Sequence, residues 1–299
     1  MKRLTMLAVA LLALVAAACS PLGLLNHLTP SDGDATRAAE GVAYGPDPRQ
    51  VLDVYTPAKP SAAAPVVVFF YGGSWSSGRR QDYAFVGKAL ASRGFVTVIP
   101  DYRLVPQVRF PAFVQDSAAA VKWAYDHAAQ YGGDAGRLAV MGHSAGAYNA
   151  MMVALDTHWL AQAGAPPGVV KAVVGLSGPY DFYPFDVPAS QEAFGAWPDP
   201  RATQPIAFAR ADAPAALLIH GLADTTVKPR NSEALAAALR AKGSEVKLEL
   251  LPGLNHTDTL KVLAVIFRGQ APVLADSVAF LDAHLLAPGR LASGRDSGR

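Results

Sequence analysis

The pentapeptide Gly142-His143-Ser144-Ala145-Gly146 constrains the fold more than any other stretch of this sequence. An apolar run at residues 138–141 precedes it, and a segment of helical composition at residues 147–155 follows it. Ser144 is therefore expected at a sharp turn from a strand into a helix, where glycines leave space beside a strained backbone. Such a turn presents the hydroxyl above the edge of a sheet, next to a helix N-terminus. The alternative is a structural turn whose serine has no chemical role.

Apolar runs and helical segments alternate along the rest of the chain at lengths that suit crossover connections. We expect strands at residues 66–70, 95–99, 138–141, 169–176, 217–219 and 246–251, and helices at residues 82–91, 116–129, 147–155, 232–241 and 272–284. Two earlier segments, residues 41–44 and 50–55, have the pattern of an antiparallel hairpin. The chain is therefore predicted to be an α/β protein with one mostly parallel central sheet and helices on both faces.

The N-terminus has the organisation of an export signal. Lys2 and Arg3 precede an apolar run at residues 4–18 that is too short to span a membrane comfortably. Cys19 follows three alanines and is the only cysteine, so no intramolecular disulfide can form. The segment resembles the lipobox of bacterial lipoproteins, in which the cysteine is lipidated and becomes the first residue of the mature protein. Ala16 stands where that motif usually has leucine, so cleavage as a plain secretory signal is the alternative.

We therefore assign residues 1–18 to a signal peptide and residues 19–39 to a polar tether. Residues 40–287 are assigned to one folded domain, and residues 288–299, rich in Gly, Ser and Arg, to a disordered tail. Lipidation of Cys19 would anchor such a protein to a membrane without a transmembrane span. The net charge of +2, without a basic run in the domain, gives no support for nucleic-acid binding.

Ligands of doubly wound sheets bind beyond the carboxyl ends of the strands, so polar residues after the apolar runs are candidates for chemistry. They are Ser74, Asp101, Arg103, Ser144, Ser177, Asp181, His220, Asp224 and His256. A serine nucleophile needs a base to take its proton, and the base needs an acid to fix its tautomer. We predict Ser144 as the nucleophile, His256 as the base and Asp224 as the acid. Their order along the chain is that of the α/β-hydrolase fold.

Several candidates have alternatives. Asp181 also follows a predicted strand and could replace Asp224 as the acid. We expect His220 to pack at a strand end, and the side chain of His143 to point away from the nucleophile. The aromatic stretch at residues 180–197 is either part of the core or a short lid that forms a wall of an acyl pocket. No residue cluster has metal-ligand spacing and no glycine-rich loop suits a dinucleotide, so no metal or other cofactor is predicted.

These motifs resemble those of serine esterases of the α/β-hydrolase superfamily, in particular hormone-sensitive-lipase-like carboxylesterases and kynurenine-formamidase-like enzymes. The resemblance extends over about residues 44–284 and rests on Phe70-Tyr71-Gly72-Gly73-Ser74-Trp75, Asp101-Tyr102-Arg103-Leu104 with Phe110-Pro111, the serine pentapeptide, His220-Gly221-Leu222-Ala223-Asp224 and the His256 loop. It implies an oxyanion hole formed by the backbone amides of Gly73, Ser74 and Ala145. Tyr71 stands where the family has a histidine, which acts on loop geometry.

The resemblance implies hydrolysis of small-molecule carboxylic esters through an acyl-enzyme intermediate, without a cofactor. The short lid favours small to medium acyl groups. Two other functions stay open at this point: an amidase or formamidase that uses the same three residues, and a non-catalytic surface lipoprotein with a binding role. Tyr71 weighs against the formamidases, whose mark is His-Gly-Gly-x-Trp. The serine, aspartate and histidine in this order weigh against a binding role.

Overall fold

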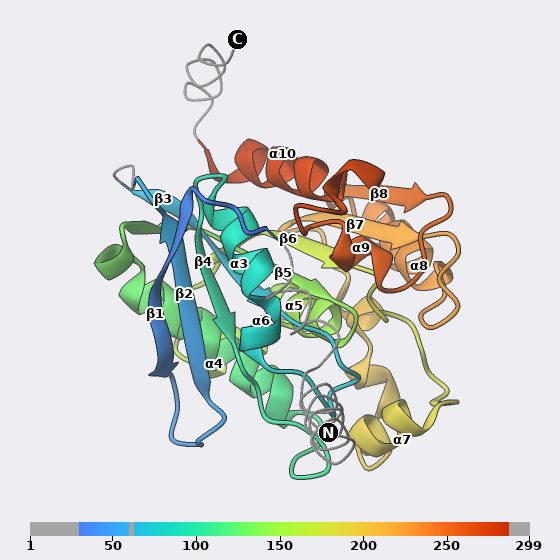
Figure 1. Cartoon of the computed structure of the whole chain (residues 1–299). Helices are drawn as coiled ribbons and strands as arrows, with labels where there is room; N and C mark the ends of the chain where they lie inside the picture. The colour runs from blue at the N-terminus through green and yellow to red at the C-terminus, as the bar shows by residue number, and fades with distance from the viewer. Residues whose placement is uncertain (1–29, 60–62, 287–299) are drawn as a thin grey trace, which may run out of the picture.

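The protein folds around an eight-stranded sheet in a computed structural model that describes residues 30–59 and 63–286 (Figure 1). The strands are β1 (Ala35–Ala43), β2 (Val51–Pro57), β3 (Ala64–Phe70), β4 (Val96–Pro100), β5 (Gly133–His143), β6 (Val170–Leu176), β7 (Ala215–Gly221) and β8 (Val246–Leu251). Their spatial order is β1-β2-β4-β3-β5-β6-β7-β8. β2 is antiparallel to β1 and to β4, and the other neighbouring pairs are parallel. This confirms the predicted sheet.

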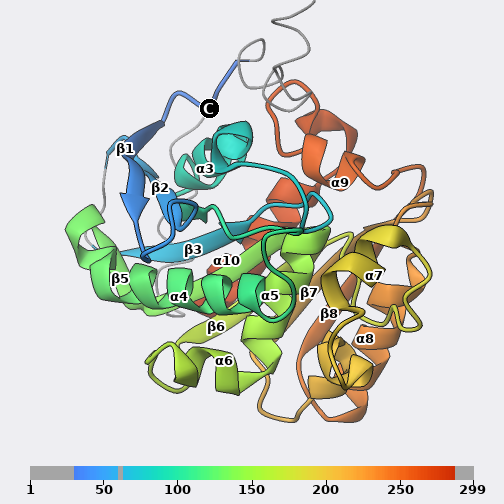
Figure 2. The same cartoon turned by 90° about the horizontal axis from the view of Figure 1, so that it is seen from below.

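Helices cover both faces of the sheet. The helices in the described part of the chain are α3 (Ala84–Ala91), α4 (Ala112–His127), α5 (Ala145–Leu155), α6 (Thr157–Gln162), α7 (Pro188–Phe194), α8 (Arg230–Ala241), α9 (Asp258–Lys261) and α10 (Val273–Leu285), with 3₁₀ turns η1 (Arg80–Tyr83), η2 (Ala128–Tyr131), η3 (Pro200–Thr203), η4 (Pro205–Phe208) and η5 (Arg268–Gln270). The β3–β4 and β4–β5 connections run in opposite directions along the sheet. Because such crossovers are right-handed, α3 and α4 lie on opposite faces (Figure 2).

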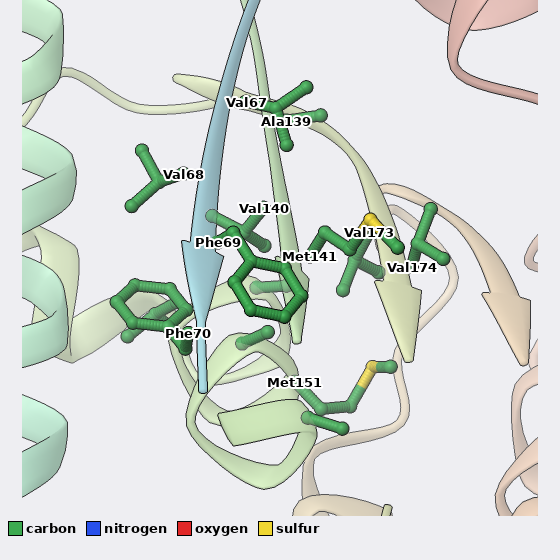
Figure 3. Packing of buried hydrophobic residues seen from close by; sticks show 14 of the residues in the cluster. Val67, Val68, Phe69, Phe70, Ala139, Val140, Met141, Met151, Val173 and Val174 are labelled. Carbon is green, nitrogen blue, oxygen red and sulfur yellow. The ribbon is translucent and has the colours of Figure 1, made fainter. Parts of the chain in front are cut away.

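The central strands are buried on both faces, which explains their continuous apolar runs. Every residue of β3 is buried. Figure 3 shows Val68 and Phe70 on one side of this strand and Val67 and Phe69 on the other. Met151 of α5 packs near the ends of β5 and β6 and is also fully buried. A sheet packed on both faces holds the carboxyl ends of its parallel strands, where the candidate residues lie, in fixed positions.

The folded domain begins earlier than the sequence predicted. β1 begins at Ala35, so the assignment of residues 35–39 to a tether is wrong. Even before this strand, Asp32 pairs with both terminal nitrogens of Arg268, at 2.8 and 2.9 Å. β1 is an edge strand that is exposed along much of its length, so it lacks the apolar alternation that would have identified it.

Other predictions concern residues outside the described part of the chain. These are the signal peptide at residues 1–18, the lipidation site Cys19 and the tail at residues 288–299. All three stay predictions. Among the helices within residues 30–59 and 63–286, none has both the length and the apolar character needed to cross a membrane.

Candidate active site

Ser144 occupies the tight turn between β5 and α5. Its backbone has φ 55° and ψ −123°, a conformation that is unfavourable for a residue with a side chain. A β carbon on Gly146 would lie 2.1 Å from the carbonyl oxygen of Phe70. One on Gly142 would lie 2.2 Å from the carbonyl oxygen of Gly146. Both glycines are therefore required because the turn brings backbone segments into direct contact, as the pentapeptide predicted.

The side chains of Ser144, His256 and Asp224 form one chain of hydrogen bonds. His256 Nε2 lies 2.9 Å from Ser144 Oγ, and His256 Nδ1 lies 2.8 Å from Asp224 Oδ2. Because a carboxylate can only accept, Nδ1 carries the proton of the neutral ring and Nε2 is free to accept the serine hydroxyl. The three residues come from loops far apart in the sequence. Their arrangement matches what a base-activated serine requires.

Asp224 is held in place and kept ionised by its neighbours. Its Oδ1 accepts the backbone N–H groups of Thr226 and Val227, each at 2.9 Å. Burial alone would raise the pKa of Asp224, but hydrogen bonds from His220 and His256 outweigh burial and hold that pKa well below its usual range. An ionised Asp224 next to Nδ1 would stabilise a positive charge on the His256 ring.

His220 packs at the end of β7, as expected, and in addition contacts the acid. It is fully buried, and its Nε2 lies 2.8 Å from the carbonyl oxygen of Val227 and 3.2 Å from Asp224 Oδ2. Both of these oxygens can only accept, so Nε2 carries the proton. Nδ1 lies 2.7 Å from the hydroxyl of Ser232 and accepts from it. His220 therefore helps to orient Asp224, a contact that the sequence did not reveal.

Asp181, the alternative acid, lies outside this chain of hydrogen bonds. Its backbone N–H donates to Asn231 Oδ1 at 2.9 Å, whereas Nδ1 of His256 donates to Asp224. Asp101 and Arg103 brace loops. Asp101 Oδ2 accepts Arg80 Nη1 at 2.7 Å, and Arg103 Nη2 donates to Asp116 Oδ1 at 2.7 Å.

The segment after β3 forms a strained loop beside Ser144. Gly73, Ser74 and Trp75 have φ values of 124°, 54° and 57°. Three consecutive residues with positive φ are unfavourable, because two of them carry side chains. The N–H groups of Ser76 and Ser77 both donate to the carbonyl oxygen of Gly73 at 3.0 Å and close the turn. The loop thus has one defined conformation at the position predicted to provide oxyanion donors.

Trp75 anchors this loop through its side chain. The indole is 5% exposed, and its Nε1 donates to Asn149 Oδ1 of α5 at 3.2 Å. Its ring packs at centroid distances of 4.7 to 6.1 Å against Phe113, Tyr148, Phe182 and Phe194. Burial of a large aromatic side chain and its edge-on contacts are favourable, and they offset the strain of the loop backbone.

Tyr71 takes the place of the histidine found in related motifs. Its ring is fully buried and stacks between Tyr83 and Tyr102, at centroid distances of 5.1 and 4.8 Å. Its hydroxyl donates to Asp101 Oδ1 at 2.8 Å, and burial raises its pKa well above the ordinary tyrosine value. A buried aromatic ring and a hydrogen bond therefore fix the start of the loop in place of a histidine.

Comparison with known proteins identifies the family of the chain. Residues 52–239 match the BD-FAE family. The chain belongs to the BD-FAE family.

Two curated relatives of this BD-FAE protein are named esterases. Over 241 residues it is 34% identical to esterase LipC of Mycobacterium tuberculosis, covering 72% of this chain and 58% of that one. Over 238 residues it is 30% identical to isoprenylcysteine alpha-carbonyl methylesterase ICME of Arabidopsis thaliana, covering 73% of this chain and 56% of that one. The chain thus spans little more than half the length of these relatives.

A solved structure shows the same fold. The inhibited esterase B from Lactobacillus rhamnosis superposes with a TM-score of 0.76 at 23% identity, covering 93% of this chain and 96% of that one. The sheet order and this likeness identify the α/β-hydrolase fold.

A cavity of about 270 Å³ opens at Ser144. Ser74 and Ala145 lie beside Ser144 in the wall of this cavity, and Phe182 and Val187 form another part of the wall. Within the aromatic stretch at residues 180–197, Phe182 lines this cavity, whereas Tyr180 and Phe194 are buried in the core. A larger cavity of about 480 Å³ lies near α6 and the start of β6 and contains none of the predicted site residues.

His143 makes a contact that the sequence did not indicate. Its side chain is only 4% exposed and points toward the loop of His256, where its Nε2 lies 2.9 Å from the backbone carbonyl oxygen. The pentapeptide predicts the turn at Ser144, but it does not indicate which segment the side chain of His143 contacts.

Within the described ranges, no group of three or more histidine, cysteine or acidic side chains is arranged to hold a metal ion.

Proposed function

We propose that this protein is a serine carboxylesterase with Ser144 as its nucleophile. The observation that carries the proposal is the continuous chain of hydrogen bonds from Asp224 through His256 to Ser144, which ends at a cavity. The names of its relatives favour esters over the amidase and binding alternatives. All the groups required for acyl transfer belong to the chain itself.

In the first half of the reaction, the ester binds with its carbonyl carbon next to Ser144 Oγ. His256 Nε2, 2.9 Å from that oxygen, takes the hydroxyl proton as Oγ forms a bond to the carbonyl carbon. Asp224 stabilises the imidazolium that results. The protonated His256 then donates its proton to the oxygen of the leaving alcohol as the ester C–O bond breaks, which leaves an acyl group on Ser144.

The negative charge that develops on the carbonyl oxygen needs fixed donors. We assign this role to the backbone N–H groups of Gly73, Ser74 and Ala145. Ala145 is the first residue of α5, where the amides of a helix N-terminus favour negative charge. The strained loop at Gly73 and Ser74 supports the assignment, because its conformation is set before substrate arrives and needs no rearrangement during the reaction.

In the second half, water enters where the alcohol has left. His256 takes a proton from this water as its oxygen attacks the acyl carbon. The imidazolium returns that proton to Ser144 Oγ when the acyl bond breaks, which releases a carboxylic acid and restores the starting state. No cofactor takes part in these reaction steps.

The cavity volume of about 270 Å³ supports small to medium acyl groups. The test is hydrolysis of p-nitrophenyl esters from acetate to palmitate by the full chain, with Ser144→Ala as the control. We expect kcat/KM to be highest for the short acyl groups and to fall by about tenfold or more toward palmitate. A maximum at palmitate would contradict the size assignment, and equal turnover by the Ser144→Ala variant would contradict the mechanism.

We further propose that the protein is exported and lipid-anchored through Cys19. Support comes from the basic residues, apolar run and small residues that precede this cysteine. Metabolic labelling with a palmitate analogue in a bacterial host should label the wild-type chain but not Cys19→Ser. Release of an unlabelled wild-type chain into the periplasm would instead indicate plain secretion.

A further inference from the structure

His143 contacts two loops of the proposed active site besides its own turn. It directly precedes Ser144, and its ring centre lies 5.1 Å from that of His256. Its Nε2 lies 2.9 Å from the backbone carbonyl oxygen of His256. A β carbon on Gly72 would lie 3.0 Å from its Nδ1, so the ring also packs directly against the loop after β3. His143 therefore connects the turn of Ser144 to the loop of His256 and packs against Gly72, the residue before the proposed donors Gly73 and Ser74.

The protonation of His143 follows from its neighbours. A carbonyl oxygen can only accept, so Nε2 carries the hydrogen and donates to the backbone oxygen of His256. Burial, together with repulsion from a protonated His256, lowers the pKa of His143 to about 3. The side chain is thus a neutral donor at neutral pH. This suits the position, because a second positive ring beside His256 would oppose formation of the imidazolium.

Simple core packing does not account for this residue. Nδ1 of His143 is buried and has no hydrogen-bond partner among the described residues. A buried acceptor without a partner is unfavourable, and an aromatic hydrocarbon ring of similar size would avoid that cost. The polar ring is therefore explained by its other nitrogen, which makes the one hydrogen bond to the loop of the base.

We propose that His143 is a positioning residue that fixes the separation of Ser144 and His256. The inference rests on the proposed esterase function. Two hydrogen bonds of 2.9 Å connect the same two segments: one joins the side chains of Ser144 and His256, and the other joins the His143 side chain to the His256 backbone. The second bond holds the loop of the base while the first is broken and remade during proton transfer. Loss of about 1 Å of alignment at such a site reduces the rate by about 10²-fold.

The test compares His143→Gln, whose side-chain amide can still donate, with His143→Phe, which fills similar space without a donor. For each, kcat and KM are measured on p-nitrophenyl butyrate, with active sites counted by titration with a fluorophosphonate. We expect His143→Phe to lower kcat by about 10²-fold at a nearly unchanged KM. We expect His143→Gln to stay within about fivefold of the wild type, because it keeps the donor.

A matched control is His127→Phe. His127 of α4 also has a ring nitrogen near a backbone carbonyl, with Nδ1 2.8 Å from the oxygen of Trp123, but it is not part of the site. Its kcat should equal that of the wild type. If His143→Phe does not fold, His143→Asn replaces it, because the shorter amide cannot span the distance and should give the same low kcat.

The outcomes separate the donor role from shape and from the esterase assignment. Equal kcat values for His143→Gln and for the variant without a donor, whether both high or both low, would overturn the positioning role. The rate of fluorophosphonate labelling provides a second readout that needs no ester substrate. If the wild type hydrolyses no ester but labels faster than His143→Phe and as fast as His143→Gln, the positioning role stands and the esterase proposal fails.

Discussion

The two halves of the site are held in place by different means. On the nucleophile side, the turn at Ser144 and the loop at Ser74 and Trp75 have positive φ values and direct backbone contacts. On the acid–base side, no non-glycine residue in the described loops after β7 and β8 has a positive φ. Asp224 and His256 are held there by side-chain hydrogen bonds instead. Backbone fit thus sets one half of the geometry and a hydrogen-bond network sets the other.

The largest effect is expected from a substitution that removes the charge of the acid but keeps its shape. Asp224→Asn keeps the shape of the side chain but removes its charge and favours the wrong tautomer of His256. We expect kcat for p-nitrophenyl butyrate to fall by about 10⁴-fold. Asp181→Asn is the matched control and should stay within about twofold of the wild type. A similar loss for both variants would return Asp181 to the role of acid.

The next effect breaks the nucleophile half through its backbone. Gly146→Ala places a β carbon 2.1 Å from the carbonyl oxygen of Phe70, so the turn must open. We expect the free energy of unfolding, measured by urea titration, to fall by about 3 kcal/mol or more. Gly269→Ala, where nothing lies within 4 Å of the added carbon, should change it by less than about 0.5 kcal/mol. Equal values for the two would show that the turn tolerates a side chain.

The smallest effect is expected in the pH dependence of the free energy of unfolding. The pKa of His143 is lowered to about 3, below the value near 6.5 of an unfolded histidine, so the unfolded chain binds more protons between these values. The contribution of the neutral ring is complete above about pH 6.5 and is lost as the pH falls, by about 1.4 kcal/mol per unit. From pH 6.5 to 5, the wild type should therefore lose about 2 kcal/mol relative to His143→Gln.

This window avoids the titration of Asp224. A carboxylate with a lowered pKa loses its contribution only below its unfolded value near 3.9, so Asp224 does not contribute between pH 6.5 and 5. Urea unfolding of both proteins at the two pH values provides the measurement. Parallel loss of stability in the wild type and in His143→Gln would mean that His143 is accessible to protons in the folded state.

The difference between backbone fit on one side of the site and a hydrogen-bond network on the other also explains which parts of the structure the sequence could predict. The turn at Ser144 and the central strands were predicted because their signals are local: glycines that flank one residue, and apolar runs in strands buried on both faces. Ser144, Asp224 and His256 were selected from positions after such runs, and the fold brings them within hydrogen-bond distance. The location of the candidate site at the carboxyl ends of the parallel strands was therefore predictable from the sequence.

The parts that the sequence did not predict depend on distant contacts or weak local signals. His143 and His256 are 113 residues apart, and nothing in the pentapeptide indicates their hydrogen bond. The contact of His220 with Asp224 was missed because the sequence around a histidine at a strand end does not show which side chain the histidine contacts. Short helices such as α7 and α9 carry too few residues for a helical period, and the exposed edge strand β1 lacks alternation.

The most direct test of the central claim is reaction of the full chain with a fluorophosphonate, followed by peptide mapping by mass spectrometry. The account predicts a single adduct on Ser144 that is absent from Ser144→Ala and that forms more slowly in Asp224→Asn. An adduct on another residue, or no adduct on the folded wild-type protein, would contradict the assignment of Ser144 as an activated nucleophile.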